Sequence, residues 1–123
     1  MNTLILDIDN EAGVKKVKEL SKYDTVIIGT IRRPKLFPIP DVIVVNFDFI
    51  LETKRREEIL VELAAKLHPQ VLIISCADEW QKGKVDLAKA FGVDHCVKFS
   101  DIDNLPVLLF ACTKAIFPTL YFS

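Results

Sequence analysis

The chain has 123 residues, of which 50% are hydrophobic and 27% are charged, and its formal net charge is −1. This composition excludes a disordered chain, and the length predicts one domain that spans residues 1–123. The nearly neutral charge provides no basic field, so nucleic acid is not an expected partner. Acidic and basic residues are almost equally numerous and rich in Lys and Glu, which resembles the surface of a thermophilic protein.

The N-terminal residues reach acidic side chains after one short apolar run, unlike a secretory signal peptide. The longest apolar stretch, about 13 residues over 105–117, contains a proline and a lysine and is too short to span a bilayer. The three cysteines, Cys76, Cys96 and Cys112, match no metal-binding spacing. We therefore expect a cytoplasmic protein that makes no membrane contact and keeps its cysteines reduced.

Apolar runs rich in β-branched residues alternate with segments of helical periodicity. Strands are expected at Thr3–Asp7, Thr25–Thr30, Val42–Phe47, Val71–Ser75 and Val93–Phe99. Helices are expected at Glu11–Lys22, Thr53–His68 and Glu79–Phe91, and from about Pro106 to Pro118. The segment Arg32–Pro40 (RRPKLFPIP) contains three prolines and is predicted to be a loop.

This alternation is typical of βαβ units, whose right-handed crossovers place helices on both faces of a parallel sheet. The uniformly apolar run VLIIS, Val71–Ser75, indicates a central strand that is buried on both faces. The predicted fold is a single three-layer (αβα), Rossmann-like α/β domain with a mostly parallel five-stranded sheet.

Acidic side chains follow several of the predicted strands. Because ligands of parallel α/β sheets bind beyond the carboxyl ends of the strands, these side chains are candidate site residues. The candidate Mg²⁺ ligands are Asp7, Asp9, Asp48, Asp78 and Glu79. The structural alternative is local capping: Asp9 or Asn10 for the first helix, and Asp78 with Gln81 as a capping box for the third.

The second predicted strand ends at Thr30 and leads to two arginines. Thr30, Arg32 and Arg33 are candidate contacts for a phosphate or another ligand. Together with the acidic strand ends, they would support metal-assisted phosphoryl chemistry.

Two pieces of sequence carry family resemblances. LILDIDN, Leu4–Asn10, resembles the first motif of haloacid-dehalogenase-type phosphatases, an apolar strand followed by Asp-x-Asp, and the strand that ends at Thr30 is similar to their second motif. Asp7-x-x-Asn10 and IISCADEW, Ile73–Trp80, are similar to motifs of PIN-like nucleases of the NYN type. These resemblances imply a Mg²⁺-dependent phosphatase or nuclease that uses the acidic strand ends.

Cys76 stands where the fourth strand is expected to turn into a helix, and a helix N-terminus lowers the pKa of a thiol. It resembles in position the nucleophilic cysteine of rhodanese-like and tyrosine-phosphatase-like enzymes. The neighbouring Asp78 and Glu79 would repel an anionic substrate. A buried, unreactive cysteine accounts for the same pattern.

The segment Leu105–Phe122 is apolar nearly all round, so it must be covered on more than one side. We expect a homodimer or a protein partner to contact it. Because each catalytic pattern is incomplete, the function expected first is a non-catalytic binding or regulatory module that acts as a dimer. The alternatives are the Mg²⁺-dependent phosphatase or nuclease and a thiol enzyme that uses Cys76.

Overall fold

The structure is a computed structural model in which residues 2–8, 25–37 and 39–99 are described. The strands are β1 Asn2–Leu6, β2 Thr25–Gly29, β3 Val42–Asn46, β4 Leu72–Ala77 and β5 His95–Lys98. The helices are α2 Phe47–Ile50, α3 Lys54–Leu67 and α4 Lys82–Ala90. Each described strand lies within two residues of its predicted bounds.

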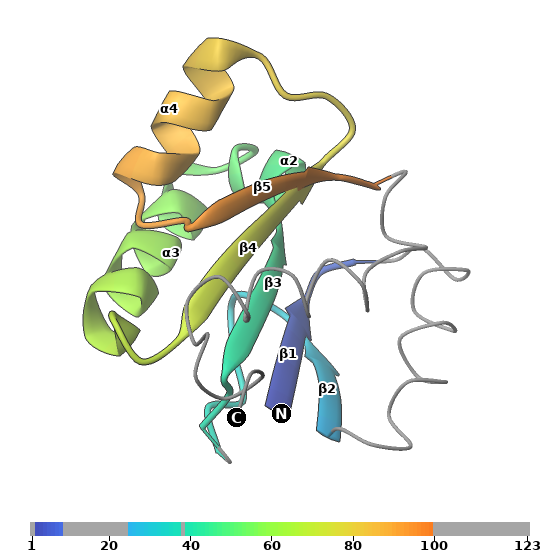
Figure 1. Ribbon diagram of the computed structural model, residues 1–123, viewed down its shortest axis with the longest axis vertical. Coiled ribbons are helices and arrows are strands. Elements are labelled where there is room, and N and C mark those ends of the chain that lie inside the picture. Colours follow the sequence, from blue (N-terminus) through green and yellow to red (C-terminus); the bar gives the residue numbers. More distant parts are fainter. Residues whose placement is uncertain (1, 9–24, 38, 100–123) are drawn as a thin grey trace, which may run out of the picture.

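The strands form one parallel sheet in the order β2-β1-β3-β4-β5 (Figure 1). The Rossmann-like parallel α/β fold predicted from the sequence is thereby confirmed. The chain moves outward from β1 to β2 and then crosses back over β1 to reach β3, so the order reverses between β1 and β3. In sheets of this order, that reversal is where ligands bind.

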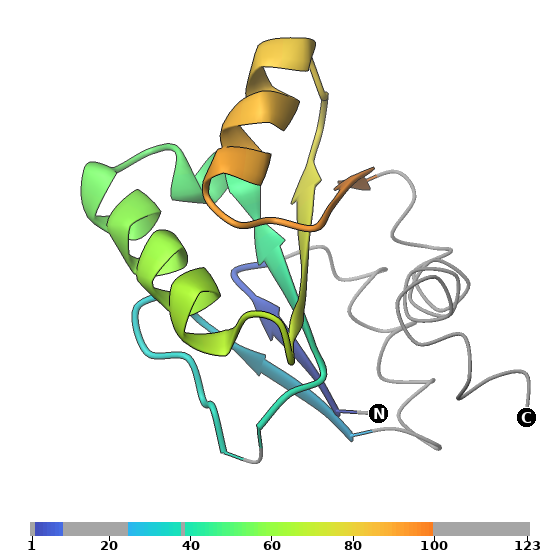
Figure 2. The same cartoon turned by 60° about the vertical axis from the view of Figure 1, so that its left-hand side comes forward.

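Helices α2, α3 and α4 lie on one side of the sheet, where the larger core is found (Figure 2). The centre of this core is Phe47, which is fully buried; its ring centroid lies 5.5 Å from that of Trp80 and 6.0 Å from that of Phe91. Leu60 and Leu63 bring the apolar face of α3 onto the same cluster. This burial holds the short helix α2 in place directly after β3.

The opposite face of the sheet is buried as well. Its cluster consists of Ile5, Ile8, Val42, Val44, Leu72, Ile74 and Cys76, none of which is more than 5% exposed. Burial on both faces is what the three-layer arrangement requires. The predicted helices Glu11–Lys22 and Pro106–Pro118 lie outside the described residues.

The connection from β2 to β3 contains no helix among its described residues, as its prolines predicted. It crosses the sheet on the same side as α3 (Figure 2), and Ile31 and Leu36 pack into the larger core. The connection from β3 to β4 includes the long helix α3. Thr53 caps this helix, its hydroxyl accepting a hydrogen bond from the Arg56 N–H at 3.2 Å.

Two local predictions were wrong, and one short helix was not predicted. The helix expected from Glu79 begins at Lys82, and its N-cap is Gln81, which makes no side-chain capping hydrogen bond. The capping box of Asp78 with Gln81 therefore does not form, because the N–H of Asp78 is held by Asp48. The short helix α2 was also missed. Gly92 follows the C-cap Phe91 and ends α4 with φ 99°, a conformation that glycine adopts readily.

Candidate functional site

Asp7 lies directly after β1, at the reversal of the strand order. It adopts φ 59°, a left-handed conformation that Asp tolerates better than most residues. Its N–H donates to the Gly29 carbonyl at 3.0 Å, and its Oδ2 accepts from the Ile31 N–H at 2.7 Å. The carboxylate therefore fastens the end of β1 to the chain that leaves β2.

Asn46, the last residue of β3, connects this point to α2. Its Nδ2 donates to the Asp7 carbonyl at 3.0 Å, and its Oδ1 accepts from the Phe49 N–H at 3.2 Å, which caps α2. Both ends of the amide are thus used within the protein. Asn46 was not among the predicted site residues.

Asp48, in the first turn of α2, joins three elements at the carboxyl edge of the sheet. Its Oδ1 accepts from the Lys84 ammonium of α4, and its Oδ2 accepts from the Asp78 N–H at 3.1 Å. Partial burial by itself would raise the pKa of Asp48. The hydrogen bonds from Lys84 and Asp78 and the lysine charge outweigh it, so the pKa is lowered and the carboxylate is ionised at neutral pH.

Lys84 in turn connects this edge to the loop before α4. Its Nζ donates to the Glu79 carbonyl at 3.2 Å and lies 5.5 Å from the centroid of the Trp80 ring. Trp80 packs against Phe47, and its Nε1 donates to the Val97 carbonyl of β5 at 2.7 Å. A chain of contacts therefore runs from the end of β3 to the edge strand β5.

The structure brings the predicted metal ligands together only in part. Asp48 and Asp78 meet, but Asp78 contributes its backbone N–H and its side chain is exposed. The Glu79 carboxylate lies 3.9 Å from Lys98, and both of these side chains are more than half exposed. Among residues 2–8, 25–37 and 39–99, no three His, Cys, Asp or Glu side chains are grouped so that they could hold a metal ion. Asp9 lies outside the described residues.

The predicted phosphate contacts lie elsewhere. Thr30, Arg32 and Arg33 are exposed on the turn that follows β2, which is an edge strand. Strand β1 separates this turn from the end of β3 and hence from Asp48. Asp48 and the arginines are thus not brought to one place, whereas the Asp7 carboxylate binds the N–H of Ile31, next to Arg32 in this turn.

Cys76 lies inside β4 rather than at a strand-to-helix turn, because β4 continues to Ala77 and α4 begins only at Lys82. Its side chain is fully buried, and burial raises the pKa of the thiol to about 12. A thiol of this pKa is protonated at neutral pH, whereas a nucleophilic cysteine needs the thiolate. The described geometry therefore favours the unreactive alternative.

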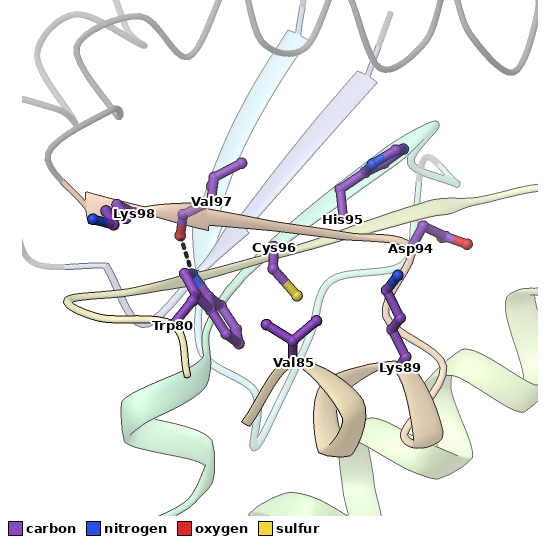
Figure 3. Close-up of a pocket in the computed structure, with 8 residues that line it drawn as sticks. All are labelled: Trp80, Val85, Lys89, Asp94, His95, Cys96, Val97 and Lys98. Carbon is purple, nitrogen blue, oxygen red and sulfur yellow. Dashed lines mark hydrogen bonds between the residues drawn. The ribbon is translucent and has the colours of Figure 1, made fainter. Parts of the chain in front are cut away.

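An open groove of about 560 Å³ lies between α4 and β5. Figure 3 shows Cys96 pointing from β5 toward Val85 of α4, with Trp80 at one end and Lys89 near the other. Burial raises the pKa of Cys96, and the charge of Lys89 offsets this in part. The groove has an apolar floor and lysines at its rim, which suits contact with another chain more than covalent chemistry.

The sequence reasoning missed Lys84 and this groove. The signal for Lys84 was its place in the first turn of a helix that follows an acidic strand end. Recognising it as the partner of Asp48 required the order of β3 and β4 in the sheet, which spacing along the chain does not provide.

No protein-family model matches the sequence, and no curated protein matches it. Solved structures do match in fold. A protein assigned to pilus assembly (CpaE) from Burkholderia thailandensis has a TM-score of 0.66 at 14% identity, over 92% of this chain and 98% of that one. A CheY-like response regulator from Mesorhizobium loti has a TM-score of 0.63 at 12% identity, over 89% and 95%. A LuxR-family DNA-binding response regulator from Staphylococcus aureus has a TM-score of 0.57 at 16% identity, over 85% and 91%.

These similarities establish the class of fold, a CheY-like Rossmann-type α/β domain. The strand order β2-β1-β3-β4-β5 is that of CheY itself. At such low identity, they establish nothing about activity.

Proposed function

We propose that this chain is a non-catalytic regulatory module that acts through contacts with other protein chains. The observation that carries the proposal is the internal pairing at the carboxyl edge of the sheet. The functional groups of Asn46 and Asp48 are bonded to groups of the same chain, and Asp7 binds the Ile31 N–H. A catalytic site needs such groups directed at a substrate.

The fold comparisons support the same proposal. Two of the three solved structures described above are named as response regulators, and none of these three is named as a phosphatase or a nuclease. The fold similarity therefore supports a regulatory role for this chain more than a phosphatase or nuclease activity.

The contacts also suggest how such a module would work. Lys84 binds Asp48 at the end of β3, and it is a first-turn residue of α4 that lies against Trp80. Trp80 in turn binds β5. A change at Asp48 would alter the position of α4 relative to β5, and hence the groove between them. A protein partner at this groove would sense that change.

The finer features remain part of the proposal. A homodimer or a partner contact through Leu105–Phe122 is supported by the apolar pattern of that segment, which lies outside the described residues. Cys76 and Cys96 are both free, which is consistent with a cytoplasmic location.

The first test is an amide NMR spectrum titrated with Mg²⁺ and then with trace Mn²⁺. We expect only weak, scattered effects on exposed acidic residues, because Asp48 is already paired with Lys84. Selective broadening around Asp7, Asp48 and Asp78 at submillimolar metal would contradict the proposal and favour the Mg²⁺-dependent phosphatase or nuclease.

The second test addresses the dimer by sedimentation equilibrium over a wide concentration range. We expect self-association that Leu109→Asp abolishes. Val61→Asp, at an exposed apolar position of α3, is the matched control and should leave association unchanged. A wild-type chain that stays monomeric at every concentration would remove the dimer from the proposal.

A further inference from the structure

Exposed and less exposed residues alternate over 33–37 in the loop between β2 and β3, and Ile39 and Pro40 continue the pattern. Arg33, Lys35, Phe37 and Ile39 are exposed, whereas Pro34 and Leu36 are half-buried and Pro40 is buried. The loop therefore presents two cations followed by two apolar side chains on its outer side.

The outer side chains are unusually free. Phe37 is 90% exposed and Ile39 is 62% exposed, the two highest values among the large apolar residues that the structure describes. The side chains of Arg32, Arg33 and Lys35 make no hydrogen bond or ion pair with any residue that the structure describes. Asp41, which follows the loop, is also exposed; its carboxylate accepts a hydrogen bond from the Asn2 N–H at 2.8 Å and keeps its negative charge, so the three cations outnumber this one carboxylate.

The inner side holds the loop in position. Ile31 is fully buried, Leu36 packs on the larger core, and Pro40 is buried where β3 begins. The prolines also restrict the backbone in the unfolded chain. The backbone that carries the outer side chains therefore has little conformational freedom left to lose on binding.

From these observations we infer that this loop is a docking surface for an anionic lipid bilayer. Cations attract anionic headgroups, and exposed aromatic and aliphatic side chains enter the boundary between headgroups and acyl chains one at a time, without a matching pocket. Proline has no N–H, so the three prolines over 32–40 reduce the number of backbone donors that this boundary would dehydrate.

A protein partner fits the loop less well. A stable protein interface buries roughly 800 Å² on each partner, more than two projecting side chains provide. The proposal departs from the expectation of no membrane contact, which rested on the lack of an apolar stretch long enough to span a bilayer. No helix among the described residues is long and apolar enough to cross a bilayer. The lipid contact does not depend on the regulatory function proposed above.

The test is co-sedimentation of the full chain with vesicles. We expect binding to mixed phosphatidylcholine and phosphatidylglycerol vesicles, loss of binding at high salt, and little binding to pure phosphatidylcholine. The double variant Arg33→Gln/Lys35→Gln should weaken binding about 25-fold, about fivefold for each cation removed. Phe37→Ser/Ile39→Ser should weaken it by at least about tenfold.

The matched control is Lys66→Gln/Val61→Ser, which removes one exposed cation and one exposed apolar side chain from α3. It should bind as the wild type does. Circular dichroism of each variant shows whether its fold is retained. A Phe37→Trp variant adds a direct readout, because brominated lipids should quench the emission of the introduced indole but not that of Trp80, which packs on Phe47.

Three results would overturn the inference. These are a wild-type chain that does not bind anionic vesicles, loop variants that bind as well as the wild type, and a control variant that loses as much binding as the loop variants. The second result would place any lipid contact on another surface of the chain.

Discussion

The carboxyl edge around Asp48 and the loop between β2 and β3 differ in whether their charged groups are paired within the protein. At the edge, Asp48 binds Lys84 and the Asp78 N–H, and the neighbouring Asn46 uses both ends of its amide. In the loop, Arg33 and Lys35 are exposed and have no side-chain partner among the described residues.

The difference separates structural polar groups from those available for binding. Paired groups at a partly buried position contribute to folding, and removing one partner leaves the other unsatisfied. Exposed, unpaired groups contribute little to folding, and they are available for contacts outside the molecule. Measurements of stability and of binding should therefore respond to different residues.

The largest expected effect tests what holds the edge in place. Phe47→Ala removes a fully buried ring that contacts Trp80 and Phe91 beneath α2. We expect the free energy of unfolding to fall by about 3–5 kcal/mol. Urea unfolding followed by circular dichroism measures it. A loss below about 1 kcal/mol would mean that α2 and Trp80 are not packed around this ring.

A smaller effect is expected where α4 meets α3. Gly92 has φ 99°, and a Cβ there would lie 2.5 Å from the Ala64 Cβ. Gly92→Ala should therefore cost at least about 2 kcal/mol, from the left-handed backbone and the clash together.

Gly83 provides the control for this substitution. It lies in α4, and a Cβ there would meet nothing within 4 Å. Gly83→Ala should leave stability unchanged or raise it by up to about 1 kcal/mol, because alanine favours the helix. Equal losses in the two variants, measured by urea unfolding, would show that α4 does not pack on α3 as described.

The pair at the edge should give a pH-dependent effect. At neutral pH, Asp48→Asn should lower the free energy of unfolding by about 1 kcal/mol, since the pair is partly exposed to solvent. The pKa of Asp48 is lowered in the folded protein below its ordinary value of 3.8, by Lys84 and by the Asp78 N–H. Its contribution is therefore present above that unfolded pKa and disappears as the pH falls through the lower folded pKa.

Urea titrations of the wild type and of Asp48→Asn over this acidic range measure that contribution. The difference between the two proteins should shrink as the pH is lowered. Glu62→Gln, at an exposed position of α3, is the control and should follow the wild type. A difference that stays constant down to the lowest pH would mean that Asp48 does not titrate with Lys84 as its partner.

The strands and the two longer described helices could be predicted from the sequence because the spacing of apolar residues along the chain follows which side chains are buried. The run Val71–Ser75 is apolar at every position but the last, as a strand buried on both faces must be. The prolines of Arg32–Pro40 likewise predicted the loop. These features depend on residues that are close along the chain.

The candidate site could be predicted only as an edge of the sheet. The partners of Asp48 lie 30 and 36 positions away, and their meeting depends on the strand order. Asp78 was expected to cap a helix, but α4 begins further along the chain at Lys82, and the Asp78 N–H donates to Asp48 instead. The sequence also did not indicate which apolar residues of the loop are exposed. Leu36 and Phe37 are adjacent, yet Leu36 packs on the larger core and Phe37 is exposed.

Leu36 and Phe37 provide the smallest expected effect on stability, and they compare the inner and the outer side of the loop most directly. Phe37→Ser removes a side chain that is 90% exposed, so the free energy of unfolding should change by no more than about 0.5 kcal/mol. Leu36→Ser, one residue earlier on the inner side, should cost about 1–2 kcal/mol because Leu36 packs on the larger core. Urea midpoints compare the two variants directly. Similar losses in both would mean that the loop does not alternate between an inner and an outer side, and the outer side chains would then no longer be free to bind.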